Sequence, residues 1–289
     1  MHERQQTSLA VVLWTVFGGA VALLVTAPAP CVTSLHETLT SFAAQISTPL
    51  QAEESNPAPF KPSADSMADV DAALARARAN GKLAIIVLGA NWCHDSQGLI
   101  HHFQTAEMQK ILTDRYELLL LDVGYLQHGT DVVNRFGQPV IYGTPTVFVV
   151  DPATEQVINR KRLHQWRAAA SISLADTIAY FDGLKWTEPS PADTPVPANL
   201  EAALEKIKSF EEKQARRIAH AYEILGPLVA MERDERPDNF YDMWEQVRVL
   251  RYKLTDDLTT LRAVATRQAA YSDKDIELEF PQYQPFDWE

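Results

Sequence analysis

The chain has 289 residues, of which 46% are hydrophobic and 22% charged, and its formal net charge is −12. This length accommodates two domains, or one domain with an anchor and an appendage. The negative charge argues against nucleic acid or anionic lipid as the main partner. The two cysteines, Cys31 and Cys93, are too few for a disulfide scaffold or a four-ligand zinc site.

The N-terminal segment predicts a membrane anchor. Residues 1–8 are polar and form an expected cytoplasmic N-tail, and residues 9–29 form an expected transmembrane anchor or uncleaved signal. The triplet 27–29 resembles a signal-peptidase site, so cleavage is the alternative, although Pro30 would follow the cut. With Arg4 inside, the rest of the chain faces the outer compartment, which in a bacterium is the periplasm.

The segment 30–65 predicts a linker with a possible short helix, because proline, serine and alanine dominate its second half. Asp65 or Ser66 is the expected helix cap at the start of a domain that spans 66–186. The elements predicted there are a helix that stops at Gly81, a strand at 83–88, a helical pattern at 97–112, a strand at 117–123, a short helix at 131–136, two hairpin strands at 146–151 and 155–160, and a helix at 171–186.

The sequence WCHDS at 92–96 follows a predicted strand and opens a predicted helix. A helix N-terminus carries partial positive charge and free N–H groups, which favour the thiolate of Cys93. A protonated His94 also favours the thiolate, and the Ser96 hydroxyl can donate a hydrogen bond to the sulfur. Asp95 opposes the thiolate by like-charge repulsion. The sequence does not decide whether these neighbours together favour or oppose the Cys93 thiolate.

Three features together resemble the thioredoxin family over residues 66–186. They are the run LGANWC at 88–93, the run GTPT at 143–146, and the order of the predicted elements. The resemblance implies an α/β, thioredoxin-like fold, with a mixed central sheet flanked by helices. It also implies that Cys93 is the nucleophile, that Pro145 is cis and lies against its sulfur, and that Thr144 and Trp92 contact an extended substrate segment.

Two departures from that family narrow the chemistry. Ser96 stands where the second cysteine of a C-x-x-C motif resolves the mixed disulfide, and Val87 stands where a buried aspartate often assists that cysteine. A single thiol can form a mixed disulfide but needs another thiol for release. The expected chemistries are disulfide shuffling, reversible capture of a client, or removal of a small thiol. No cofactor is implied.

Each of these residues also has a simpler interpretation. Cys93 can be an inert, half-buried thiol in a fold kept as a docking platform. Trp92 can be an apolar cover of the sheet, and Pro145 a tight turn without substrate contact. We expect no metal at His101 and His102, because adjacent helical residues point about 100° apart. Cys31 would need the linker to fold back to act as the second thiol.

The C-terminal third predicts a separate helical unit. Residues 187–197 form a proline-rich linker, 198–272 a helical hairpin, and 273–289 an acidic and aromatic tail. Pro227 is expected to kink or end the first helix. Met243, Leu250 and Val264 widen the second apolar stripe and predict a third surface against the hairpin. The tail is predicted either to be disordered or to dock across a partner.

Two functional hypotheses follow. The first is a membrane-anchored periplasmic protein with a single active-site cysteine that exchanges or captures the thiols or disulfides of client proteins. The second is a redox-silent accessory subunit of a membrane complex, which docks through the anchor and the C-terminal helices. The first requires an accessible, reactive Cys93, whereas the second tolerates its loss.

Overall fold

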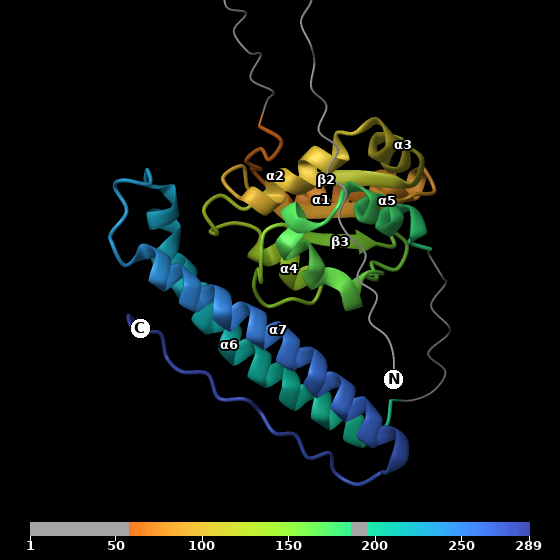
Figure 1. Ribbon diagram of the computed structural model, residues 1–289. Helices are drawn as coiled ribbons and strands as arrows, with labels where there is room; N and C mark the ends of the chain where they lie inside the picture. Colours follow the sequence, from red (N-terminus) through yellow and green to blue (C-terminus); the bar gives the residue numbers. More distant parts are fainter. Residues whose placement is uncertain (1–57, 186–195) are drawn as a thin grey trace, which may run out of the picture. The chain divides into compact units, whose positions relative to one another are not determined.

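A computed structural model describes residues 58–185 and 196–289 (Figure 1). The predicted N-tail, the anchor, and most of both predicted linkers lie outside these residues. Within the two described ranges, no helix combines the length and the apolar character that a membrane crossing requires.

The centre of the first described range is a three-stranded mixed sheet. Its middle strand, β1 (Leu83–Gly89), pairs in parallel with β2 (Tyr116–Asp122) and antiparallel with β3 (Thr146–Val150), so the strand order is β2-β1-β3. Both predicted apolar runs are strands because buried parallel strands need apolar side chains on both faces. The mixed sheet flanked by helices that the resemblance implied is confirmed.

The two faces of the sheet bury different apolar clusters. On one face, which we call the Trp166 face, Ile85 and Val87 of β1 pack with Trp166 and Phe181. On the other, which we call the hairpin face, Ile86 and Leu88 point into a second cluster. Helices that contribute to the Trp166 face are α2 (His94–Phe103), α3 (Ala106–Arg115), η1 (Arg160–Ser171) and α5 (Leu174–Gly183). Those of the hairpin face are α1 (Ser66–Ala79), α4 (Thr130–Arg135) and the two C-terminal helices.

Capping residues determine where several helices begin. The Asp65 side chain accepts a hydrogen bond from Ala68 N and starts α1, as predicted. The helix predicted over 97–112 is instead two helices, because Thr105 caps α3 by accepting from Met108 N. The helix predicted at 171–186 begins at Leu174, after the Ser173 cap, and ends at Gly183.

The predicted second hairpin strand at 155–160 is wrong. Only a single bridge, between Val150 and Val157, joins this segment to β3. The Asn159 side chain then accepts from Val149 N and donates to Val147 O. Its amide occupies backbone groups of β3 that a neighbouring strand would use, and the chain turns into η1 at Arg160.

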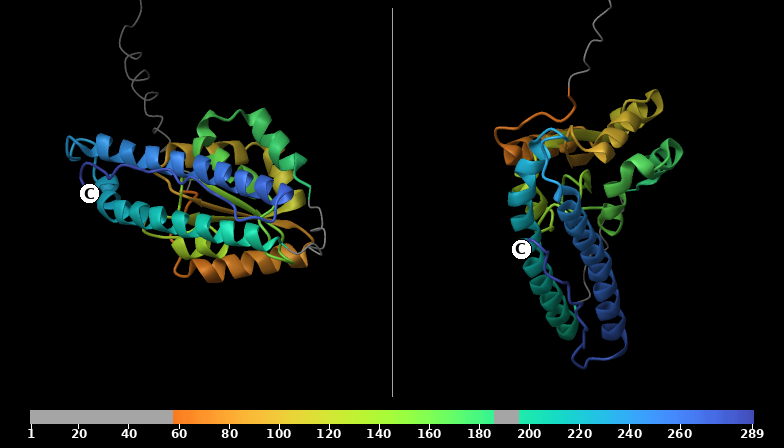
Figure 2. Two further views of the ribbon diagram at one scale, coloured as in Figure 1. Left: turned by 90° about the horizontal axis from the view of Figure 1, so that it is seen from below. Right: turned by 60° about the vertical axis from the view of Figure 1, so that its left-hand side comes forward.

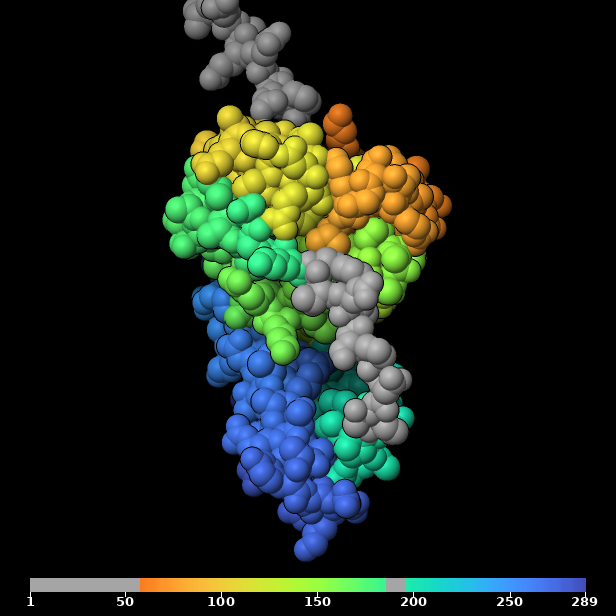
Figure 3. All heavy atoms as spheres, turned by 90° about the vertical axis from the view of Figure 1, so that its right-hand side faces the viewer, coloured from red at the N-terminus to blue at the C-terminus, as the bar shows by residue number. Residues whose placement is uncertain are grey.

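The C-terminal helices α6 (Ala198–Ala230) and α7 (Phe240–Tyr271) lie side by side along their length (Figures 1 and 3). Ile218, Leu225 and Leu254 are fully buried in the cluster of the hairpin face. The expectation that α6 ends at Pro227 is wrong, since the helix continues to Ala230, whereas a kink at Pro227 stays a prediction. Proline has no N–H to donate to the carbonyl four residues earlier, so the helix lacks that one hydrogen bond at Pro227.

The acidic and aromatic tail packs on the chain's own hairpin (Figure 2). Ile276 and Phe286 are buried, the Tyr283 hydroxyl donates to Asp257, and Arg217 binds the Glu289 carboxylate. Both predictions for the tail, disorder and docking on a partner, are therefore replaced by intramolecular packing. Of the residues that predicted a third surface, Met243 and Leu250 are buried and Val264 is half-buried.

Candidate functional site

Cys93 occupies the N-cap position of α2, directly after the turn that follows β1. Its backbone is extended there, with φ −86° and ψ 119°, and the residue is 8% exposed. The sulfur makes no capping hydrogen bond to the helix. The local sequence therefore places the cysteine at the start of the helix, as predicted from the motif.

Thr144 meets this sulfur from the loop before β3. The Thr144 hydroxyl donates to Cys93 Sγ at 3.2 Å, and the thiol donates to Thr144 O at 3.2 Å. The Thr144–Pro145 peptide bond is cis, which confirms the expectation drawn from the resemblance. Gly143 is required beside it, since a Cβ at this position would lie 2.9 Å from the Cβ of Arg167. The loop therefore brings a backbone oxygen and a hydroxyl to the sulfur.

Ser96 lies behind the site and is fully buried. Its hydroxyl oxygen accepts from Ala90 N at 3.3 Å, in the turn between β1 and α2. The sequence analysis assigned the hydroxyl donor of Cys93 to Ser96, but the donor in this structure is Thr144. Ser96 instead holds the turn that presents the cysteine.

His94 and Asp95, which were also predicted to affect the Cys93 thiolate, have different surroundings. His94 is exposed in the first turn of α2. The Asp95 carboxylate accepts from Ala170 N at 3.0 Å and thereby attaches η1 to α2. This contact is close because Gly98 lacks a side chain, and a Cβ there would lie 2.7 Å from the Cα of Ala170. Asp95 thus has a structural partner away from the sulfur.

Trp92 is enclosed between two aromatic rings. Its indole N–H donates to Gly124 O at 2.7 Å, and its ring stacks on Tyr125 at 6.4 Å with an interplanar angle of 13°. Trp244 of α7 approaches edge-on at 6.2 Å and 80°. The hairpin therefore contributes an aromatic side chain beside a residue that the sequence analysis predicted to contact substrate.

Part of this chain is similar to known proteins. A family profile described as thioredoxin-like matches residues 65–152. This segment is a thioredoxin-like domain. A solved disulphide isomerase from Xylella fastidiosa Temecula1 aligns with 25% identity and a TM-score of 0.40, over 43% of this chain and 95% of that one. A search of curated proteins finds no match.

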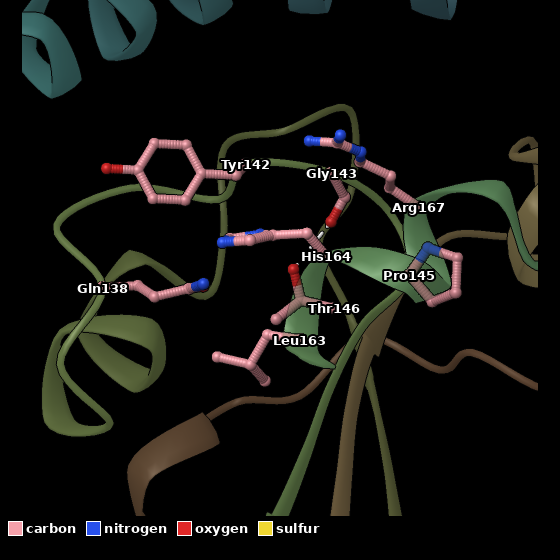
Figure 4. Close-up of a pocket in the computed structure, with 8 residues that line it drawn as sticks. All are labelled: Gln138, Tyr142, Gly143, Pro145, Thr146, Leu163, His164 and Arg167. Carbon is pink, nitrogen blue, oxygen red and sulfur yellow. Dashed lines mark hydrogen bonds between the residues drawn. The ribbon is translucent and has the colours of Figure 1, made fainter. Parts of the chain in front are cut away.

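A small cavity lies behind the cis-proline of the thioredoxin-like domain (Figure 4). Its volume is about 10 Å³, room for one water molecule, and Pro145, His164 and Arg167 are among the residues that line it. Burial, reinforced by the charge of Arg167, lowers the pKa of His164 to about 4. The imidazole beside the loop is therefore neutral at pH 7.

No group of three or more histidine, cysteine, aspartate or glutamate residues in the described ranges has a geometry suited to a metal ion. Of the two adjacent histidines, His102 directs its Nδ1 at the hydroxyl of Thr177, 3.0 Å away. Burial, followed by the neighbouring His101, lowers the pKa of His102. His102 therefore belongs to the packing between α2 and α5, whereas His101 is exposed.

Sequence reasoning missed the residues through which the hairpin touches the site. Trp244 reaches Trp92, and Arg167 of η1 donates to Thr255 of α7 at 2.6 Å. The positions in each pair are far apart in the chain, and no local motif marks them. The single available signal was the width of the apolar stripe on the second helix, which indicated a further surface without identifying it.

Proposed function

We propose that this protein carries out thiol–disulfide exchange with Cys93 as its single attacking sulfur. The observation that carries the proposal is the Thr144 hydroxyl, which donates to Sγ at 3.2 Å beside the cis-proline and at the start of a helix. A hydrogen-bond donor and a helix N-terminus both stabilise negative charge on sulfur. The thioredoxin-like domain places the hydroxyl donor on Sγ and the cysteine at the helix start, and in the thiol form the same sulfur donates to Thr144 O.

The exchange has two balanced steps. The Cys93 thiolate attacks one sulfur of a client disulfide, forms a mixed disulfide and expels the other client sulfur as a thiolate. A client thiolate, or a small thiol, then attacks the mixed disulfide and returns Cys93 as a thiolate. The client exchanges one disulfide for another when its own thiol performs the second step, so no net oxidant is needed. With Ser96 at the second position, release by an internal cysteine of the motif is absent from this cycle.

The client is proposed to be a protein with exposed thiols or disulfides, bound as an extended segment along Thr144 and Pro145. The half-buried face of Trp92, backed by Tyr125, supports an apolar side chain of such a segment. His94 follows Cys93 in the chain and is exposed, and it is proposed to interact with the leaving thiolate.

The proposed location is the outer face of a bacterial inner membrane, with residues 9–29 as a single-pass anchor and the thioredoxin-like domain in the periplasm. The apolar run that begins at residue 9 and the single basic residue ahead of it, Arg4, support this topology. Secretion after signal cleavage is the alternative. Disulfide-bonded clients are common in the periplasm, in agreement with the proposed chemistry.

A second candidate is a redox-silent subunit of a membrane complex. The low exposure of Cys93 and the contact between Trp92 and Trp244 favour it, because a covered thiol suits a docking platform. However, the apolar stripes of α6 and α7 pack within this chain, against the thioredoxin-like domain and the tail. That packing reduces the helical surface available to a partner.

The deciding experiment compares the Cys31→Ser chain with Cys31→Ser/Cys93→Ser. Each is mixed with a protein whose disulfides have been scrambled, and recovery of the native disulfides is followed together with acid-trapped mixed disulfides. We expect faster recovery and a reductant-sensitive adduct with Cys93 present and neither with serine in its place. Equal recovery with both chains, together with no adduct and no native alkylation of Cys93, would support the redox-silent subunit.

A further inference from the structure

The loop that carries Thr144 makes two hydrogen bonds with α6, one in each direction. The Tyr222 hydroxyl of α6 donates to Ile141 O at 2.6 Å. One residue later, the Tyr142 hydroxyl donates in the opposite direction, to the Glu211 carboxylate of α6 at 2.9 Å. Consecutive loop residues thus offer one backbone oxygen and one side chain to the same helix.

Both tyrosine hydroxyls are deeply buried, and Tyr142, Tyr222 and Glu211 are each less than a tenth exposed. Burial raises the pKa of Tyr142, with the Glu211 carboxylate adding to the effect, and burial also raises the pKa of Tyr222. Both groups therefore stay protonated and act as donors at any physiological pH. A buried acceptor that loses such a donor is left unsatisfied, so these bonds tie the loop firmly to the helix.

Arg251 of α7 contacts both Tyr222, which binds the loop, and Trp244, which packs on Trp92. It is only 6% exposed and donates from Nη1 to the Tyr222 hydroxyl at 3.1 Å. Its guanidinium carbon also lies 5.4 Å from the ring centroid of Trp244, which contacts Trp92. One buried cation therefore supports both the side that holds Thr144 and the side that holds Trp92.

Close backbone packing fixes the same arrangement. A Cβ on Gly226 of α6 would lie 2.6 Å from Tyr125 O, so α6 lies directly against the turn whose tyrosine stacks on Trp92. On the opposite side, Arg167 lies against Gly143 and its guanidinium carbon is 3.7 Å from the Tyr252 ring centroid of α7. The loop is wedged between the hairpin and η1.

We infer that the α6–α7 hairpin is a positioning element of the Cys93 site and that Tyr222 is its main positioning residue. Tyr222 does not touch the sulfur. It acts through Ile141 on the loop and thereby sets the distance from the Thr144 hydroxyl to Sγ. The inference deepens the proposed function and rests on it only for the statement that the sulfur reacts with clients.

The test uses the full-length chain with Cys31→Ser and compares Tyr222→Phe with Tyr283→Phe. Tyr283 also donates a hydroxyl hydrogen bond within the hairpin region, but to Asp257 on the tail side. Two quantities are measured: the rate of Cys93 alkylation by iodoacetamide from pH 5 to 10, and the methyl order parameters of Ile141 and Thr144 by NMR.

For Tyr222→Phe we expect alkylation at pH 7 to fall about threefold to tenfold, because a weakened donor to sulfur costs about one hydrogen bond. The midpoint of the pH profile should rise, and the methyl groups of Ile141 and Thr144 should become more mobile. Tyr283→Phe should leave all of these at wild-type values. Should Tyr222→Phe fail to fold, Tyr142→Phe is the second variant, with the same expected direction.

Wild-type pH profiles and methyl order parameters in Tyr222→Phe would overturn the inference, as would equal changes in Tyr283→Phe. The outcome is separate from that of the proposed function. If Cys93 never forms a mixed disulfide with a client, the proposed function fails, yet the alkylation profile still reports on positioning. If Cys93 does not alkylate at all, the methyl order parameters alone decide.

Discussion

The two faces of the central sheet are covered in different ways. The Trp166 face is closed by helices of the thioredoxin-like segment and by η1 and α5, and its centre is aromatic: Trp166 stacks on Phe181 at 5.1 Å and meets Tyr180 edge-on at 4.8 Å. On the hairpin face, α1 and α4 are joined by α6 and α7, and the contacts include buried Glu211, Arg251 and Thr255.

The two kinds of contact have different consequences, one for the stability of the domain and the other for the position of the Thr144 loop. Aromatic packing contributes large, non-directional stabilisation from apolar area removed from water. Buried hydrogen bonds add little net stabilisation, but each one is costly to break and demands a specific geometry. Apolar packing stabilises both faces, and the hairpin face in addition specifies where the Thr144 loop lies. The following predictions test this contrast in order of expected effect.

The largest effect is expected for Trp166→Ala, on the Trp166 face. The side chain is fully buried between aromatic neighbours, so the cavity should lower the free energy of unfolding by about 3–5 kcal/mol. Urea denaturation followed by circular dichroism measures it. Tyr271→Ala is the control, because Tyr271 is 87% exposed and should change stability by less than about 0.5 kcal/mol. A small loss in Trp166→Ala would remove the assigned role of this face.

The next effect is the pH dependence that His164 contributes. Its pKa is lowered from 6.5 to about 4 in the folded protein, so the unfolded chain binds more protons between those values. Stability must therefore fall as pH decreases, and His164 should account for about 2 kcal/mol of loss between pH 7 and pH 5.

His164→Gln should lack that component, which urea denaturation at pH 7 and pH 5 can measure for both chains. His94→Gln is the matched control, since His94 is exposed and should keep the wild-type difference. Equal pH dependence in wild type and His164→Gln would mean that the imidazole beside the loop is not desolvated.

A somewhat smaller effect is expected for the bond between Tyr142 and Glu211. In a double-mutant cycle with Tyr142→Phe and Glu211→Ala, the coupling free energy should be about 1.5 kcal/mol, since a buried carboxylate accepts the hydroxyl. The pair Tyr283 and Asp257 gives the comparison: it is more exposed, so its coupling should be smaller. Additive effects at Tyr142 and Glu211 would contradict the directional role of the hairpin face.

The smallest effect is expected at the start of α1, which covers the hairpin face away from the loop. Asp65→Ala removes the acceptor for Ala68 N and should cost about 1 kcal/mol in the free energy of unfolding. Asp65→Asn keeps an acceptor and should cost less. Thermal or urea unfolding measures both, and the alkylation rate of Cys93 should not change in either. A changed rate would mean that any loosening of this face reaches the site.

Sequence patterns predicted the elements whose causes are local. The apolar runs of β1 and β2, the Asp65 cap and the cysteine at the start of α2 all depend on residues within a few positions of one another. The predicted elements were wrong where a single polar side chain forms hydrogen bonds with the backbone and thereby interrupts a strand or a helix. The Asn159 amide occupies backbone groups of β3 in place of a strand, and Thr105 divides one expected helix into two.

The candidate site divides in the same way. The motif residues Trp92 to Ser96 and the loop with Thr144 and Pro145 were identified from the sequence, and the cis peptide bond is confirmed. The direction of the side chains was not available from it: Ser96 binds Ala90, Asp95 binds Ala170, and Thr144 contacts the sulfur. Hydrogen-bond partners depend on which groups folding brings within 3.5 Å, and composition does not encode that distance.

By itself, the sequence determined a cysteine at a helix start without a second cysteine, a loop with the proline that accompanies it, and a pair of long amphipathic helices. These follow from capping, periodicity and the identity of single residues, which act over a few positions. Only the tertiary structure decided that the helices lie against the loop, and that Tyr222, Arg251 and Trp244 surround the site. The physical reason is that buried polar contacts between distant segments depend on the packing of the whole chain, which no local pattern describes.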